Sequence, residues 1–134
     1  MSWSQYVTRL TNIPVGQGKC IFAAFHNLSD GKCFAQEPSR SPNVSPEEIK
    51  CIKRGFNSPG ILFTSGVTLK GLRFVYLTSI DNTILARKRN LGCVIIKCPK
   101  LHAVLIGIYS CNETVNNVFK QMAEIVESCN YPSI

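Results

Sequence analysis

The sequence predicts an α+β fold in which helices pack on a central antiparallel β-sheet. Three observations support this class: helical periodicity at both ends of the chain, a strong helix-start signal near residue 45, and short apolar segments spaced roughly ten residues apart in the second half. The 134 residues favour one domain spanning 1–134, and no repeat or linker interrupts them.

The first third of the chain predicts a helix followed by a β-hairpin. Residues 1–10 are expected to be helical because their large apolar side chains recur at helical spacing, at Trp3, Tyr6, Val7 and Leu10. The continuous apolar run 19–26 has the length of a strand. A turn at Asp30-Gly31 then leads into a returning strand over 32–36.

The second helix has the clearest local signal. Ser45 can accept a hydrogen bond from a free backbone N–H, and Pro46 occupies the first helical position, where no N–H is needed. Glu48, three residues after the cap, completes a capping box. We expect this helix to end near Phe56.

The rest of the chain predicts an antiparallel meander and a closing helix. The expected strands cover 61–63, 66–69, 72–78, 83–88, 92–97 and 103–109. The closing helix has one apolar stripe, formed by Val115, Val118, Phe119, Met122, Ile125, Val126 and Cys129.

Charge and cysteine content restrict the function classes. Lys plus Arg number 15 and Asp plus Glu number 8, so the net charge is +7 and the partner is expected to be anionic: an acidic protein, a phospholipid or a nucleic acid. No apolar run approaches the roughly 20 residues of a membrane span. The N-terminus has no secretory-signal pattern, so the seven cysteines are expected to be free thiols in the cytoplasm.

Catalytic and metal-binding patterns are weak. His26 or His102 could pair with a cysteine in a thiol enzyme, but several cysteines lie within apolar strands, where cysteine acts as a small hydrophobic residue. There is no Cys-x-x-Cys pair and no glycine-rich phosphate loop. We therefore expect no enzyme activity, no metal and no cofactor.

Two binding patterns each have a structural alternative. The segment from residue 70 to residue 100 contains seven basic residues and one acidic residue, Asp81. This excess of positive charge is typical of a phosphate or acidic-protein site, but also of a solvated basic loop. Trp3 and Tyr6 lie one helical turn apart, and Tyr131 follows the closing helix. These rings could form a floor for a polyproline II peptide, or they could pack the helices on the sheet.

The order of motifs resembles the profilin family over essentially the whole chain. Six segments carry the resemblance: Ser2-Trp3-x-x-Tyr6, Asp30-Gly31-x-x-Phe34-Ala35-Gln36, Ser45-Pro46-Glu47-Glu48-Ile49, Gly66-Val67-Thr68-Leu69-x-Gly71-x-Arg73-Phe74, Arg87-Lys88-Arg89-x-x-Gly92 and 103–109. The resemblance implies an antiparallel sheet with the terminal helices on one face and the other helices opposite. It also implies a non-enzymatic regulator of actin polymerisation.

The resemblance implies a poly-L-proline groove formed by Trp3, Tyr6, Phe34, Ile125 and Tyr131. Phe34 stands where the family usually has tryptophan, and Ile125 where many members have histidine or tyrosine. Each lost hydrogen bond is worth about 1 kcal/mol. We therefore expect proline-rich partners such as formins to bind, but roughly 10- to 30-fold more weakly.

The resemblance also implies two overlapping basic surfaces. The actin-monomer surface would comprise Phe63, Arg73, Tyr76, Arg87, Arg89, Asn116, Asn117, Lys120 and Gln121. The phosphoinositide surface would comprise Lys70, Arg73, Arg87, Lys88 and Arg89. Actin is acidic, which would explain the positive net charge, and the overlap implies that lipid and actin compete.

Two alternatives to this function remain open at this stage. One is a divergent profilin-like protein with weakened proline or actin binding. The other is a small basic nucleic-acid-binding domain, although Phe74 and Tyr76 are the only rings within the basic segment and no nucleic-acid partner is expected. The leading prediction is a cytoplasmic protein associated with the actin cytoskeleton.

Overall fold

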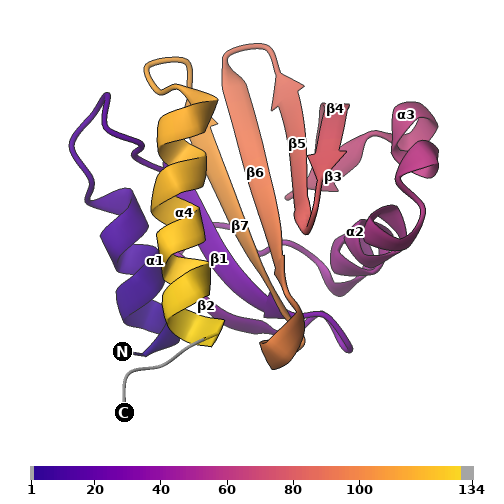
Figure 1. The fold of residues 1–134 in the computed structure, drawn as a ribbon, viewed down its shortest axis with the longest axis horizontal. Helices are drawn as coiled ribbons and strands as arrows, with labels where there is room; N and C mark the ends of the chain where they lie inside the picture. Colours follow the sequence, from indigo (N-terminus) through magenta and orange to yellow (C-terminus); the bar gives the residue numbers. More distant parts are fainter. Residues whose placement is uncertain (1, 131–134) are drawn as a thin grey trace.

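The computed structural model describes residues 2–130 and contains a seven-stranded antiparallel sheet (Figure 1). The strand order across the sheet is β2-β1-β7-β6-β5-β4-β3, so the last five strands form the expected meander. The strands are β1 (Phe22–Asn27), β2 (Cys33–Glu37), β3 (Val67–Leu69), β4 (Leu72–Ile80), β5 (Thr83–Lys88), β6 (Leu91–Cys98) and β7 (Ala103–Ser110).

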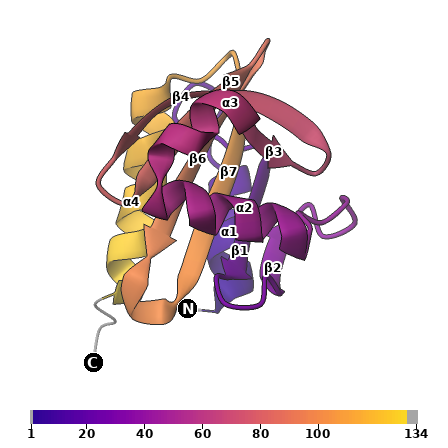
Figure 2. The ribbon, with the colours of Figure 1, turned by 90° about the vertical axis from the view of Figure 1, so that its right-hand side faces the viewer.

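Four α-helices cover the two faces of the sheet. They are α1 (Trp3–Thr11), α2 (Pro46–Asn57), α3 (Leu62–Ser65) and α4 (Val115–Asn130), and short 3₁₀ turns lie at Pro59–Ile61 and Pro99–Leu101. The helices α1 and α4 pack on one face, and α2 and α3 lie on the other (Figures 1 and 2). This arrangement confirms the predicted α+β class.

Local capping explains where the helices begin. The Ser45 hydroxyl accepts from the Glu48 N–H, and the Glu48 carboxylate accepts from the Ser45 N–H, so the predicted capping box is present. An equivalent box between Ser2 and Gln5 starts α1. None of the helices described within residues 2–130 is long and apolar enough to cross a membrane.

The sheet separates two hydrophobic cores. Alternation along β1 sends Phe22 and Ala24 toward α2, while Ala23 and Phe25 face α1 and α4. On the α1 and α4 side, Met122 is fully buried with the interior residues of β6 and β7. The apolar stripe predicted for the closing helix therefore packs on the sheet, except for Phe119, which is 41% exposed.

One predicted strand is wrong. Residues 61–63 belong to a 3₁₀ turn and to α3 instead of a strand. Leu62 is buried in the core under α2, and Gly66, with φ of 68°, ends the helix and turns the chain into β3. An apolar run of three residues carries too little periodicity to distinguish a strand from a helical turn.

The terminal helices leave part of the sheet uncovered. The helix α1 packs on β1 and β2, and α4 packs on β6 and β7. The same face of β4 and β5 has no helix over it, and Val75 on this face is 61% exposed. The main candidate site lies on this uncovered part of the sheet.

Candidate functional site

The uncovered face of β4 and β5 carries an apolar strip edged by cations. We call the five residues Arg73, Val75, Leu77, Leu85 and Arg87 the β4–β5 strip. Phe74 and Tyr76 point into the opposite core, so Arg73 and Val75 alternate onto the open face. Val75 pairs directly with Arg87 across the two strands. Leu77 alternates onto the same open side, and a bulge between Tyr76 and Thr78 interrupts the strand pairing there.

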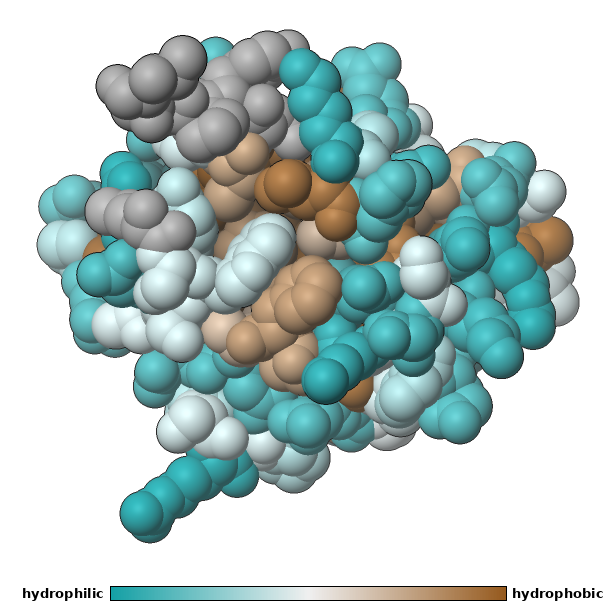
Figure 3. Space-filling model, turned by 90° about the horizontal axis from the view of Figure 1, so that it is seen from below, coloured by the Kyte–Doolittle hydropathy of each residue, from teal (hydrophilic) through white to brown (hydrophobic). Residues whose placement is uncertain are grey.

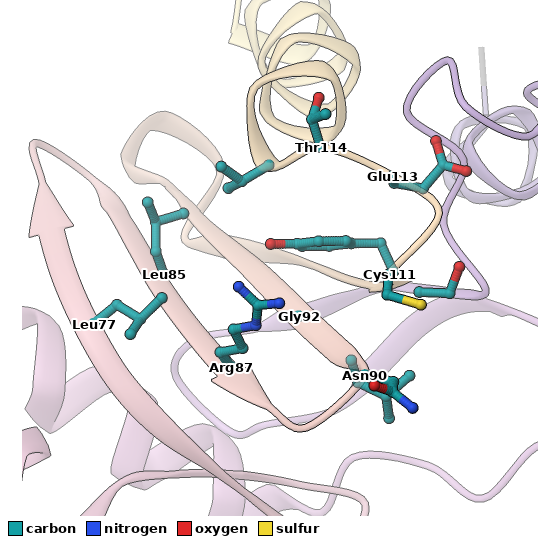
Figure 4. Close-up of a pocket in the computed structure, with 12 residues that line it drawn as sticks. Leu77, Leu85, Arg87, Asn90, Gly92, Cys111, Glu113 and Thr114 are labelled. Atoms are coloured by element: carbon teal, nitrogen blue, oxygen red, sulfur yellow. The ribbon is translucent and has the colours of Figure 1, made fainter.

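A pocket of about 250 Å³ connects this strip to the start of α4 (Figure 4). Leu77, Leu85 and Arg87 line one side, and Glu113 and Thr114 line the other. Its floor is the Tyr109 ring, which lies against Gly92 so closely that no side chain fits at that position. Burial, with a smaller contribution from Cys93, raises the pKa of Tyr109 although Arg87 opposes the shift, so the phenol stays protonated at neutral pH.

The first turns of α4 extend the strip. Val115 lines the pocket and Phe119, one turn later on the same side of the helix, is an exposed aromatic residue. Asn116 and Lys120 are also exposed. The surface that results is apolar at its centre and polar or basic at its margin, which is typical of a protein-binding interface.

Sequence reasoning missed three of these apolar positions, namely Val75, Leu77 and Phe119. A signal for the first two was present, because β4 is apolar on both of its faces. A strand with one face to solvent normally alternates apolar and polar residues. The departure from alternation indicates a face that is available for burial by a partner.

Phe63 and Tyr76 form one unit on the α3 side of the sheet, opposite the open face of the strip. Phe63 is 73% exposed, and its ring meets the Tyr76 ring edge-to-face at a centroid distance of 4.8 Å. Tyr76 itself is buried, and its hydroxyl lies 2.7 Å from the Ser79 hydroxyl. Of these two predicted actin contacts, Phe63 is therefore the one on the surface.

The predicted lipid-binding cations do not form a single cluster. Arg87 lies on the open face, whereas its neighbour Lys88 alternates toward the α2 side. Lys70 donates to the Ser41 hydroxyl at 2.6 Å and sits 4.0 Å over the Phe22 ring, and burial lowers its pKa. Lys70 is thus held on the α2 side of the sheet.

Asn117 and Gln121 face away from the strip. The Asn117 amide donates to the Gly16 carbonyl, and the Gln121 amide donates to the Gln17 carbonyl, both at 3.3 Å. These bonds tie α4 to the loop between α1 and β1. Two of the predicted actin contacts are therefore engaged with their own chain.

Two of the residues predicted for the proline groove, Trp3 and Phe34, lie in contact at the surface. Trp3 stacks on Phe34 with centroids 4.9 Å apart and an interplanar angle of 20°, and it meets the buried Phe25 edge-on at 4.7 Å. Figure 3 looks onto this end of the molecule, where hydrophobic side chains gather among hydrophilic ones. Phe34 is exposed and Trp3 is half-buried, so this pair lies at the surface.

The two other groove candidates within the described residues are Tyr6 and Ile125. Tyr6 is half-buried beside Phe25, and burial, with a smaller contribution from the neighbouring Cys129, raises its pKa although Arg9 opposes the shift. Ile125 is only 1% exposed, because its side chain belongs to the core between α4 and the sheet. The structure thus corrects the expectation that Ile125 lines a surface groove. Tyr131 lies outside the described residues.

The buried cysteines are poorly suited to nucleophilic chemistry. Cys20, Cys93 and Cys98 are buried, and burial is the main reason that the pKa of each rises to about 12. All seven cysteines are free. Within residues 2–130, no group of His, Cys, Asp and Glu side chains is arranged to hold a metal ion.

Comparisons with known proteins agree with this architecture. A profilin family model matches residues 1–131. A profilin from Bombyx mori is 30% identical over 135 residues, which cover 98% of this chain and 100% of that protein.

Solved profilin structures share the fold. Acanthamoeba castellanii profilin II has a TM-score of 0.81 at 23% identity, covering 96% of this chain and 97% of its own. Schizosaccharomyces pombe profilin also has a TM-score of 0.81, at 22% identity, covering 98% of this chain and 100% of its own. LokiProfilin2, solved in complex with rabbit actin, has a TM-score of 0.73 at 13% identity, covering 96% of each chain. The family match over nearly the whole sequence, with this shared fold, shows that the chain belongs to the profilin family.

Proposed function

We propose that this profilin binds monomeric actin through the β4–β5 strip and the adjoining turns of α4, and thereby regulates actin polymerisation. The observation that carries the proposal is the uncovered sheet face, on which Val75 and Leu77 are exposed between Arg73 and Arg87. An acidic partner complements the cations at the margin, while the apolar centre supplies burial. The complex of LokiProfilin2 with rabbit actin supports the choice of partner.

Pyrene-actin assembly tests this function, with filament barbed ends first free and then capped. The proposal expects monomer sequestration with capped ends and continued growth at free barbed ends. Val75→Asp should abolish both effects. Ser29→Asp is the control, because it adds the same negative charge at an exposed position in the turn between β1 and β2, at the opposite edge of the sheet. Unchanged assembly with the wild-type chain would refute actin as the partner.

We further propose that the Trp3–Phe34 pair binds proline-rich segments and so links actin to its assembly factors. The stacked rings offer an apolar surface that suits the polyproline II form. Trp3 is the only tryptophan in the sequence, so its fluorescence should report binding directly. Titration with a decaproline peptide tests the proposal, and the absence of saturable binding at millimolar peptide would contradict it.

Phosphoinositide binding is proposed for the two arginines of the strip together with Arg89, which follows β5. Arg73, Arg87 and Arg89 are exposed cations close to one end of β4 and β5, and each basic residue near an anionic membrane contributes about 1 kcal/mol. Because these residues overlap the proposed actin surface, phosphoinositide vesicles should compete with actin. A cytoplasmic protein acting beside the actin cytoskeleton is consistent with both activities.

The nucleic-acid alternative has a separate readout. A steep fall in RNA or DNA affinity with rising salt, together with inactivity toward actin, would favour it. The exposed apolar centre of the strip argues against it, because nucleic-acid surfaces pair cations with rings that stack on bases.

A further inference from the structure

Glu113 links the proposed actin surface to a distant part of the sequence. It lies in the turn between β7 and α4 and is 9% exposed. Its carboxylate accepts backbone N–H bonds from Gly16 at 2.7 Å, Gly18 at 2.7 Å and Lys19 at 3.1 Å. We call residues 16–19 the clasped loop. One carboxylate therefore satisfies three donors that are roughly 95 residues away along the chain.

The clasped loop is also fitted against α4. The side chains of Asn117 and Gln121 donate to the carbonyls of Gly16 and Gln17. Gly18 has φ of 99°, and a Cβ at this position would lie 2.6 Å from the Asn117 carbonyl oxygen. The first two turns of α4 are consequently held by the loop on one side while they border the β4–β5 strip on the other.

The electrostatic environment keeps Glu113 charged. Burial alone would raise the pKa of the Glu113 carboxylate. The three backbone N–H donors and the nearby Lys19 charge outweigh this effect, so the pKa is lowered. The other titratable groups around it are Cys20 behind the loop and Arg87, Tyr109 and Cys111 across the pocket. At neutral pH the side chain is therefore an acceptor for all three donors.

We propose that Glu113 is a positioning residue for the actin surface: by holding the clasped loop, it fixes the first turns of α4 in the orientation that places Asn116, Phe119 and Lys120 beside the β4–β5 strip. This inference rests on the proposed function. The physical reason is that Glu113 lines the pocket of the strip and binds the loop at the same time, so releasing the loop frees the wall of the pocket.

Glu48 offers a matched control on the opposite side of the sheet. Its carboxylate also accepts three backbone N–H bonds, from Ser45, Lys70 and Gly71, each at 2.9 Å. Glu48→Gln and Glu113→Gln therefore make the same chemical change in the same kind of contact. Of the two carboxylates, only that of Glu113 lines the pocket beside the strip.

The experiment measures actin-monomer affinity for both variants at a temperature where circular dichroism shows each to be folded. Glu113→Gln should raise the Kd for actin about tenfold, whereas Glu48→Gln should change it less than about twofold. An equal effect of the two variants, or no effect of Glu113→Gln, would overturn the positioning role. If the wild-type chain fails to bind actin, the proposed function fails instead, so the two failures are distinguishable.

Two further measurements do not depend on the glutamine variant. Gly18→Ala disrupts the same contact, because the added Cβ clashes with the Asn117 backbone. It should weaken actin binding, and the double variant with Glu113→Gln should bind actin no more weakly than Glu113→Gln alone. In the wild-type chain, coupling is reciprocal, so actin binding should slow hydrogen exchange at the Gly16, Gly18 and Lys19 amides. Unchanged exchange at these amides in the actin complex would contradict the proposal even if neither variant folds.

Discussion

The guanidinium of Arg73 donates to the carbonyl oxygen of Thr64 at 2.9 Å, and its Nε donates to Ser65 at 3.0 Å. These carbonyls end α3, the short helix that carries Phe63. Arg73 therefore does two things: it adds charge to the β4–β5 strip, and it ties α3, which carries the exposed Phe63, to the first residues of β4.

Reversing this charge should separate binding from folding. Arg73→Glu places a negative charge next to the α3 carbonyls and faces an acidic partner, so we expect the actin Kd to rise by more than about tenfold. The lost bonds are exposed, so the free energy of unfolding should fall by only about 1–2 kcal/mol. Sedimentation with pyrene-actin and urea unfolding measure the two quantities.

Lys53→Glu is the control for Arg73→Glu, because Lys53 is an exposed cation on α2, on the other side of the sheet. It should leave the actin Kd nearly unchanged while making the same change in net charge. Actin binding that survives Arg73→Glu would remove Arg73 from the interface.

The Trp3–Phe34 stack predicts how proline binding can be improved. Phe34→Trp keeps the apolar ring and adds an indole N–H, a donor that can reach a peptide carbonyl, so affinity for decaproline should rise about fivefold. Phe34→Ala should reduce it by a similar factor because it removes the stack. Isothermal titration calorimetry is the suitable measurement, since the first variant introduces a second tryptophan whose fluorescence would overlap that of Trp3. Equal affinities for all three proteins would show that Phe34 is not in the groove.

Glu113 should dominate part of the acid unfolding profile. Its pKa is lowered in the folded chain, so its contribution to stability is present above its ordinary value near 4.5 and is lost as the pH falls through the lower folded value. Thermal unfolding between about pH 2 and pH 6 should therefore show a steeper loss for the wild-type chain than for Glu113→Gln. Parallel profiles would indicate that the carboxylate is not preferentially stabilised by folding.

His26 should produce a second pH dependence nearer neutrality. It is fully buried, its Nδ1 donates to the Gly31 carbonyl at 2.9 Å, and its Nε2 has no hydrogen-bond partner among residues 2–130. Burial lowers its pKa, although Gly31 and Glu48 oppose the shift. The unfolded chain therefore binds more protons below about pH 6.5, and stability should fall as the pH drops from there.

Urea unfolding from about pH 7.5 to pH 5 measures the His26 contribution. His26→Gln should be less stable overall but should lose the slope in this range. A slope that persists in His26→Gln would assign the dependence to another group.

Periodicity predicted most of the fold because the helices and strands bury one regular face. The limits of β5, Thr83–Lys88, coincide with the predicted strand, and α2 begins at the predicted cap. Periodicity failed at α3, because this helix is a single turn whose position depends on the burial of Leu62, and one turn contains no repeat.

The candidate sites were less predictable because they depend on contacts between distant segments. Nothing near Glu113 in the sequence indicates that residues 16–19 will surround its carboxylate. Helical spacing placed Ile125 on the apolar stripe, whereas the family resemblance placed it in the surface groove, and the structure shows that its side chain faces the core. The exposed Val75 was detectable in principle, since a strand that is apolar on both faces is unusual beside solvent.

The unequal burial of the thiols gives this protein two natural attachment points for spectroscopic labels. Cys51 on α2 and Cys111 before α4 are exposed, whereas the three deeply buried cysteines should resist alkylation under native conditions. Cys111 lines the pocket beside the β4–β5 strip and Cys51 lies on the opposite side of the sheet. A fluorophore on Cys111 would therefore report directly on occupancy of the strip, with the same dye on Cys51 as an internal reference.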